Sequence, residues 1–129
     1  MFACAMLLSA AIWANPVTLA NNTCGTITCY LEVHSGTHYA YGFRDVPPNT
    51  TVSYSSAVDF VNDPYVYGLS NGIPAADLPM GLFEAIRFFD TDTHSGFIIF
   101  PNQSVAAATL PCSMAQYNAV WGGSTLIFY

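Results

Sequence analysis

The chain has 129 residues, of which 53% are hydrophobic and 8% are charged, and its net charge is −6. This length and apolar content fit one domain with a proper core and exclude a disordered chain. Only two basic side chains occur, Arg44 and Arg87, which excludes a basic patch for nucleic acid or for an anionic membrane surface.

The first 20 residues are predicted to be a secretory signal peptide. Phe2 to Ala14 are apolar apart from Ser9, a run too short to span a membrane as a helix. Small residues at Thr18 and Ala20 favour a cut after Ala20, with a cut after Ala14 as the second choice.

The basic residues that usually precede such an apolar run are missing here. Two alternatives therefore stay open: the first Met is internal to a longer signal, or the segment is retained and packs against a partner subunit. If the signal is removed, residues 21–129 form a single β-rich extracellular domain without a membrane span.

The first half of this domain is predicted to be made of strands. Residues 26–33 and 38–43 alternate in β-branched and aromatic content and form a hairpin, and residues 50–55 form a third strand. Residues 64–68 form a short further strand.

One helix is predicted near residues 78–89. Asp77 is a good N-cap and Pro79 suits the first turn. Apolar residues recur at helical spacing at Leu78, Leu82, Phe83, Ile86 and Phe89. The alternative is a strand over residues 83–91, which are rich in aromatic side chains.

Three more strands are predicted over residues 96–100, 103–109 and 124–129. About seven strands with regular turn signals indicate a mainly β fold, an antiparallel β-sandwich or barrel.

Three cysteines remain if Cys4 leaves with the signal: Cys24, Cys29 and Cys112. An oxidising compartment favours one disulfide, and both Cys24–Cys29 and Cys29–Cys112 are candidates. The odd thiol then joins two chains or is buried.

N-glycosylation sequons begin at Asn21, Asn49 and Asn102. Asn21 lies at the predicted mature terminus, Asn49 follows two prolines and Asn102 follows one, so all three sequons are expected in exposed turns. The sequons support secretion.

Aromatic residues are the candidates for ligand binding. Tyr39 and Tyr41 share one strand face, as do Tyr65 and Tyr67, and Trp121 precedes two glycines. Exposed rows of tyrosine suit stacking on sugar rings or on a protein. The alternative is that these side chains fill the core.

A divalent metal is the one candidate cofactor. Asp90, Asp92 and His94 would point to the same side of an extended strand and could ligate a cation. The alternative is an ordinary solvated turn. Glu32, His34 and His38 form a second such cluster at the tip of the predicted hairpin.

Catalytic signatures for nucleophilic hydrolysis, phosphate binding, zinc proteolysis and dinucleotide binding are missing from the sequence, so no catalytic residue is assigned. The first hypothesis is a secreted or cell-surface, non-enzymatic recognition domain that binds a glycan or a surface protein. The second is an extracellular structural subunit that assembles with copies of itself, its apolar residues 125–129 adding to a neighbour's sheet. The third is a small metal-dependent enzyme.

Overall fold

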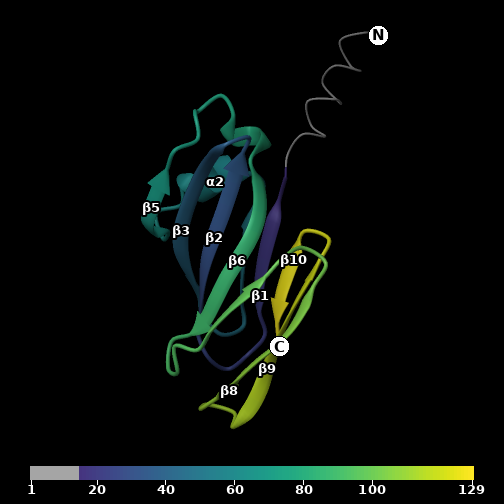
Figure 1. The fold of residues 1–129 in the computed structure, drawn as a ribbon. Helices are drawn as coiled ribbons and strands as arrows, with labels where there is room; N and C mark the ends of the chain where they lie inside the picture. Colours follow the sequence, from purple (N-terminus) through teal and green to yellow (C-terminus); the bar gives the residue numbers. More distant parts are fainter. Residues whose placement is uncertain (1–14) are drawn as a thin grey trace, which may run out of the picture.

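A computed structural model of the chain describes residues 15–129 (Figure 1). These residues form ten strands, one short α-helix and one turn of 3-10 helix. In chain order the elements are β1 (Val17–Asn21), β2 (Ile27–Ser35), β3 (His38–Val46), β4 (Thr50–Tyr54), α2 (Ala57–Val61), β5 (Tyr67–Asn71), η1 (Leu78–Met80), β6 (Leu82–Asp90), β7 (Gly96–Ile99), β8 (Ser104–Leu110), β9 (Ala115–Gly122) and β10 (Thr125–Phe128).

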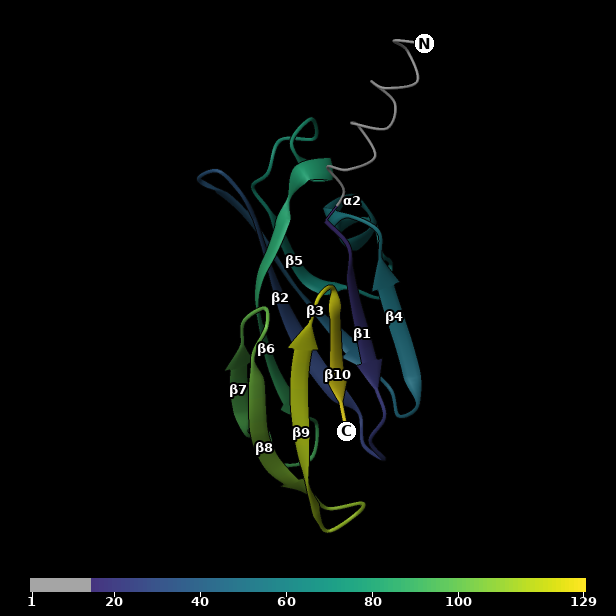
Figure 2. The ribbon, with the colours of Figure 1, turned by 90° about the vertical axis from the view of Figure 1, so that its right-hand side faces the viewer.

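The strands form two five-stranded sheets that pack face to face as a β-sandwich. One sheet has the strand order β4-β1-β10-β9-β8 and the other has the order β5-β3-β2-β6-β7. Figure 2 shows the first sheet in front, with its five strands side by side. The predicted mainly β sandwich is thus confirmed, with ten strands rather than about seven.

The first sheet brings distant parts of the chain together. β1 runs parallel to β10, with Thr18 opposite Thr125 and Asn21 opposite Phe128. β1 also pairs antiparallel with β4, while β8, β9 and β10 form an antiparallel meander. Both β1 and β10 therefore lie in the interior of the sheet, each between two neighbouring strands.

The second sheet is built on the long hairpin of β2 and β3. Their register runs from Ile27 opposite Val46 to Ser35 opposite His38. β6 pairs with the other side of β2, and β5 and β7 form the two edges.

Alternating burial along the strands places the core between the sheets. In β2, for example, Leu31 and Val33 are fully buried, whereas Tyr30 and His34 are partly exposed on the outer face. Phe88 of β6 joins the two sheets, because its ring centroid lies 5.0 Å from that of Phe128 in β10.

The helix α2 covers one end of the core (Figure 2). Ser56 caps it, because the Ser56 hydroxyl accepts a hydrogen bond from the backbone N–H of Val58. The buried ring of Phe60 packs edge-on against Tyr54. Gly42 leaves room for this ring, since a Cβ at Gly42 would lie 3.1 Å from Phe60.

The predicted helix over residues 78–89 is wrong. Asp77 and Pro79 belong only to the single 3-10 turn η1, and the chain continues as strand β6. The strand that was the alternative prediction, over residues 83–91, is confirmed.

A bulge in β6 explains the helix-like spacing. Val33 lies opposite Phe83 and Glu32 lies opposite Ala85, so Glu84 is an extra residue on the β6 side. Phe83 and Ile86 consequently both face the core although they are three residues apart. That spacing imitates one turn of a helix.

Candidate functional site

The outer face of the sheet β5-β3-β2-β6-β7 is rich in aromatic side chains. Strand alternation turns every second residue of β2 and β3 toward this face. The aromatic residues that lie there are Tyr30, Tyr39, Tyr41, Phe43, Tyr67 and Phe89.

One residue from each of the five strands forms a row across this face. Tyr67 of β5 lies opposite Phe43 of β3, which lies opposite Tyr30 of β2. Tyr30 lies opposite Arg87 of β6, and Arg87 lies opposite Ile98 of β7. We call these five residues the cross-strand row, which is about 19 Å long because neighbouring strands are about 4.8 Å apart.

An open groove follows the cross-strand row and has a volume of about 810 Å³. Its lining residues are Tyr30, Phe43, Gly68, Arg87, Phe88, Phe89, Gly96, Phe97 and Ile98. Gly68 lets β5 approach the groove closely, since a Cβ at Gly68 would lie 3.1 Å from the ring of Phe43.

The aromatic rings pack against one another. The ring centroid of Phe43 lies 4.6 Å from that of Tyr30 and 5.4 Å from that of Tyr67. The ring of Tyr41 lies 5.9 Å from both Tyr30 and Tyr39, with ring planes within 12°. These contacts restrict the side-chain rotamers, so the surface is preorganised for a ligand.

The carboxylate of Asp45 and the hydroxyls that it binds lie on one side of the cross-strand row. Its Oδ1 accepts hydrogen bonds from the hydroxyls of Thr28 and Tyr67, both at 2.8 Å. Burial, and then the hydrogen bond to Asp45, raise the pKa of Tyr67 above its ordinary value. The phenol therefore stays protonated and can accept a hydrogen bond from a ligand.

Ionisable side chains lie on the other side of the row. Glu32 Oε2 lies 3.6 Å from Nη1 of Arg87, which is itself in the row, and His34 Nε2 lies 3.8 Å from Glu84 Oε2. The Arg87 side chain is 55% exposed. The face therefore combines an apolar floor with donors and acceptors on both sides of it.

Three of the five predicted ligand-binding residues, Tyr39, Tyr41 and Tyr67, come together on this face. Tyr65 lies just before β5, where the guanidinium of Arg44 is 5.0 Å from the centroid of its ring.

Trp121 lies away from this surface. It belongs to β9 in the other sheet, is 3% exposed and borders a smaller hollow of about 240 Å³. The structure therefore places it in the core, the alternative that the sequence left open.

Sequence reasoning missed Tyr30, Phe43, Arg87 and Phe89. The alternation of the predicted strand over residues 26–33 already placed Tyr30 on the side of Glu32 and His34. That polar side identifies an outer face, and an aromatic residue on an outer face is a signal for binding.

The proposed metal ligands Asp90, Asp92 and His94 are not arranged around one point. β6 ends at Asp90, which is buried and accepts hydrogen bonds from the backbone N–H groups of Asp92 and Thr93 and from the Thr93 hydroxyl. Burial alone would raise the pKa of Asp90, but these hydrogen bonds hold it below its ordinary value. The carboxylate thus caps a turn, and Asp92 and His94 are exposed.

The second predicted metal cluster, Glu32, His34 and His38, is not arranged around one point either. Glu32 and His34 share the outer face, but they face Arg87 and Glu84, while His38 lies at the hairpin tip opposite Ser35. Within residues 15–129, no three histidine, cysteine or acidic side chains are grouped closely enough to hold a metal ion.

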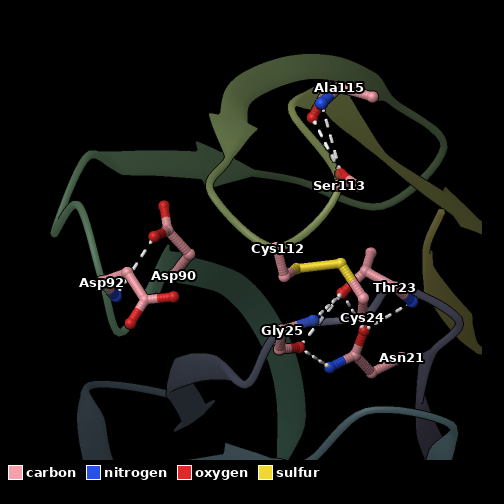
Figure 3. The surroundings of a disulfide bond; sticks show 9 residues. All are labelled: Asn21, Thr23, Cys24, Gly25, Asp90, Asp92, Cys112, Ser113 and Ala115. Carbon is pink, nitrogen blue, oxygen red and sulfur yellow. Dashed lines mark hydrogen bonds between the residues drawn. A yellow bond between two sulfur atoms is a disulfide. The ribbon is translucent and has the colours of Figure 1, made fainter.

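The disulfide joins Cys24 to Cys112, a pairing that the sequence analysis did not consider (Figure 3). It ties the loop after β1 to the loop between β8 and β9. Cys29 is a buried free thiol that points into the core, so Cys24–Cys29 and Cys29–Cys112 are both wrong. Burial, and then the charge of Asp45, raise the pKa of the Cys29 thiol, which keeps it protonated. Cys4 lies outside the described residues.

The three sequons differ in accessibility. Asn49 and Asn102 are exposed in turns between strands, each with a positive φ, 56° and 65° respectively. Asn21 is fully buried, and its Nδ2 donates two hydrogen bonds to backbone carbonyls, so the predicted exposure of this sequon is wrong. In the folded chain only Asn49 and Asn102 present their amides to solvent.

The C-terminal strand is already paired on both sides. β10 hydrogen-bonds to β1 and to β9, and Leu126 and Phe128 are fully buried. Residues 125–129 are therefore not available in this fold to extend the sheet of a neighbour.

The disulfide indicates that the chain folds in an oxidising compartment. Among the described helices, none combines the length and the apolar character that a membrane crossing requires. The first 14 residues of the predicted signal peptide lie outside the described residues.

Comparisons with protein-family models, with curated proteins and with solved structures found no match to this chain.

Proposed function

We propose that the mature chain is a secreted, non-catalytic recognition domain that binds a glycan in the groove along the cross-strand row. The observation that carries this proposal is the row itself, because Tyr67, Phe43 and Tyr30 form a continuous aromatic floor. Aromatic faces stack on the apolar faces of sugar rings.

The bordering polar groups support a glycan rather than a hydrocarbon. Sugar hydroxyls both donate and accept hydrogen bonds, and the face offers carboxylate acceptors at Asp45 and Glu32 and a guanidinium donor at Arg87. A purely apolar ligand that covered these polar groups would remove their hydrogen bonds to water and offer none in return.

Secretion is supported by the disulfide, by the apolar segment that begins the chain and by the accessible sequons at Asn49 and Asn102. Neither sequon is among the residues that line the groove.

The test is a glycan array probed with natively secreted protein, followed by affinity measurements on the retained glycans. Tyr30→Ala and Phe43→Ala should each weaken binding by about 1–3 kcal/mol, by analogy with aromatic residues that stack on the bases of single-stranded nucleic acids. Tyr129→Ala is the matched control, because Tyr129 is 57% exposed and lies outside the groove.

An array without any retained glycan would refute the glycan proposal. If a pull-down then captured a cell-surface protein, and Tyr30→Ala abolished that capture, the face would be a protein interface instead. Tyrosine and arginine are the residues that also dominate such interfaces.

A further inference from the structure

The groove carries no unpaired positive charge. The whole sequence has two basic side chains, Arg44 and Arg87. Arg44 donates a hydrogen bond to Asp63 at 3.1 Å, and only 16% of its side chain is exposed. Arg87 lines the groove, but the carboxylate of Glu32 lies 3.6 Å away and offsets its charge.

Negative charge predominates around the groove. Glu32, Glu84 and Asp45 bring three carboxylates to the outer face, where Arg87 is the one fixed cation among the described residues. An acidic polysaccharide bound along the cross-strand row would meet net negative charge, because Glu32 and Asp45 each lie two residues along a strand from a member of the row and Glu84 lies on the same face beside His34. Such like-charge contacts are costly and exclude wrong partners.

The same carboxylates are good acceptors for hydroxyl groups. Hydrogen bonds from neutral sugars need no compensating cation, and the aromatic floor supplies the apolar contact. The groove is open and follows a row about 19 Å long. This shape suits a segment of a polysaccharide rather than a single sugar.

We infer that the ligand is an uncharged polysaccharide, bound as an extended segment across the five strands from Tyr67 to Ile98. This inference rests on the glycan-binding function proposed above. It goes further by assigning Glu32 and Glu84 the role of excluding acidic glycans.

The experiment compares polysaccharides with and without charge on the same type of backbone by affinity gel electrophoresis. Suitable pairs are hydroxyethyl cellulose with carboxymethyl cellulose, dextran with dextran sulfate, and highly methyl-esterified pectin with polygalacturonate. We expect an uncharged member to be retained at least about tenfold more tightly than its charged counterpart, since like charges would face each other. Its affinity should also be nearly independent of ionic strength.

The charge assignment is tested with the double variant Glu32→Gln/Glu84→Gln. The ratio of its affinities for the charged and the uncharged member should rise several-fold above that of wild type, because the loss of carboxylate acceptors affects both members alike whereas the loss of negative charge favours the charged member alone. Asp77→Asn is the matched control, because Asp77 precedes η1 rather than lying on a strand of the outer face, and its side chain makes no cap to η1.

The outcomes separate the two proposals. If a charged member is retained as tightly as its uncharged counterpart, or if the double variant does not change the discrimination, the inference is wrong although glycan binding stands. If wild type retains no polysaccharide and no array glycan, the proposed function fails and the inference fails with it.

Discussion

Asn21 holds the chain in place at the end of β1. Its Nδ2 donates hydrogen bonds to the carbonyls of Gly25 and Val46, both at 2.8 Å. Its Oδ1 accepts hydrogen bonds from the backbone N–H of Thr23 at 2.9 Å and from the Thr23 hydroxyl at 2.7 Å. The Asn-x-Thr spacing that predicts a glycosylation site therefore builds a turn here, beside the disulfide (Figure 3).

We expect the secreted protein to carry glycans at Asn49 and Asn102 and none at Asn21. The amide of Asn21 is fully buried and used in hydrogen bonds, whereas the other two lie in exposed turns. Mass spectrometry of glycopeptides from the secreted protein measures occupancy at each position. Folded protein with a glycan on Asn21 would contradict the structure.

Tyr117 is buried, and among the described residues its hydroxyl makes no hydrogen bond. Burial, and then the charge of Asp90, raise the pKa of this phenol, so it stays neutral. Because a buried polar group without a partner is costly, Tyr117→Phe should leave the free energy of unfolding unchanged or increase it by about 1 kcal/mol.

Tyr54→Phe is the control for Tyr117→Phe in urea unfolding experiments. The Tyr54 hydroxyl donates to the Asp63 carboxylate at 2.6 Å, so its removal should cost about 1.5–3 kcal/mol. A clear loss of stability in Tyr117→Phe would mean that its hydroxyl is satisfied, for example by a buried water.

At the scale of the elements, β1 is the strand that links β4 to the C-terminal strands of the first sheet. It pairs with β4 on one side and with β10 on the other, and Val17 and Leu19 are fully buried. A signal cut after Ala20 would remove nearly all of this strand. A cut after Ala14, the second choice from the sequence, leaves it whole.

We therefore expect the secreted chain to begin at Asn15. The intact mass of the secreted protein measures this start directly. A protein of residues 15–129 should unfold cooperatively, while one of residues 21–129 should fail to fold because β4 and β10 lose their shared partner. A folded secreted chain that begins at Asn21 would refute this account of β1.

Elements formed by neighbouring residues were predictable from the sequence. The hairpin of β2 and β3 follows from alternation on either side of a turn at Gly36. β9 was missed, because Ala115–Gly122 contains few β-branched residues, and β1 was missed because most of it falls within the predicted signal peptide of 20 residues. The parallel pairing of β1 with β10 joins the two ends of the described chain, and no local pattern encodes such a contact.

At the scale of the whole molecule, the disulfide closes a loop with a sequence separation of 88 residues. A loop of this length should contribute about 4–5 kcal/mol by restricting the unfolded chain. The double variant Cys24→Ala/Cys112→Ala should lose stability of this order in urea unfolding. Cys29→Ala removes a free thiol and should lose far less, so an equal loss in both variants would contradict this role.

Part of the candidate site could also be predicted from the sequence. Tyr39 and Tyr41 share a face because they are two residues apart in a strand. The cross-strand row could not be predicted, since it depends on β2 lying between β3 and β6 and on β5 and β7 forming the edges. That order is decided by the packing of the whole sandwich.

The measurement that tests the central claim most directly is NMR titration of ¹⁵N-labelled protein with a polysaccharide retained on the array. The account predicts that backbone amide shifts change along the cross-strand row, at and beside Tyr67, Phe43, Tyr30, Arg87 and Ile98. Amides of β4, β1, β10, β9 and β8 should remain unaffected. Changes concentrated on that other sheet, with the cross-strand row unchanged, would contradict the account.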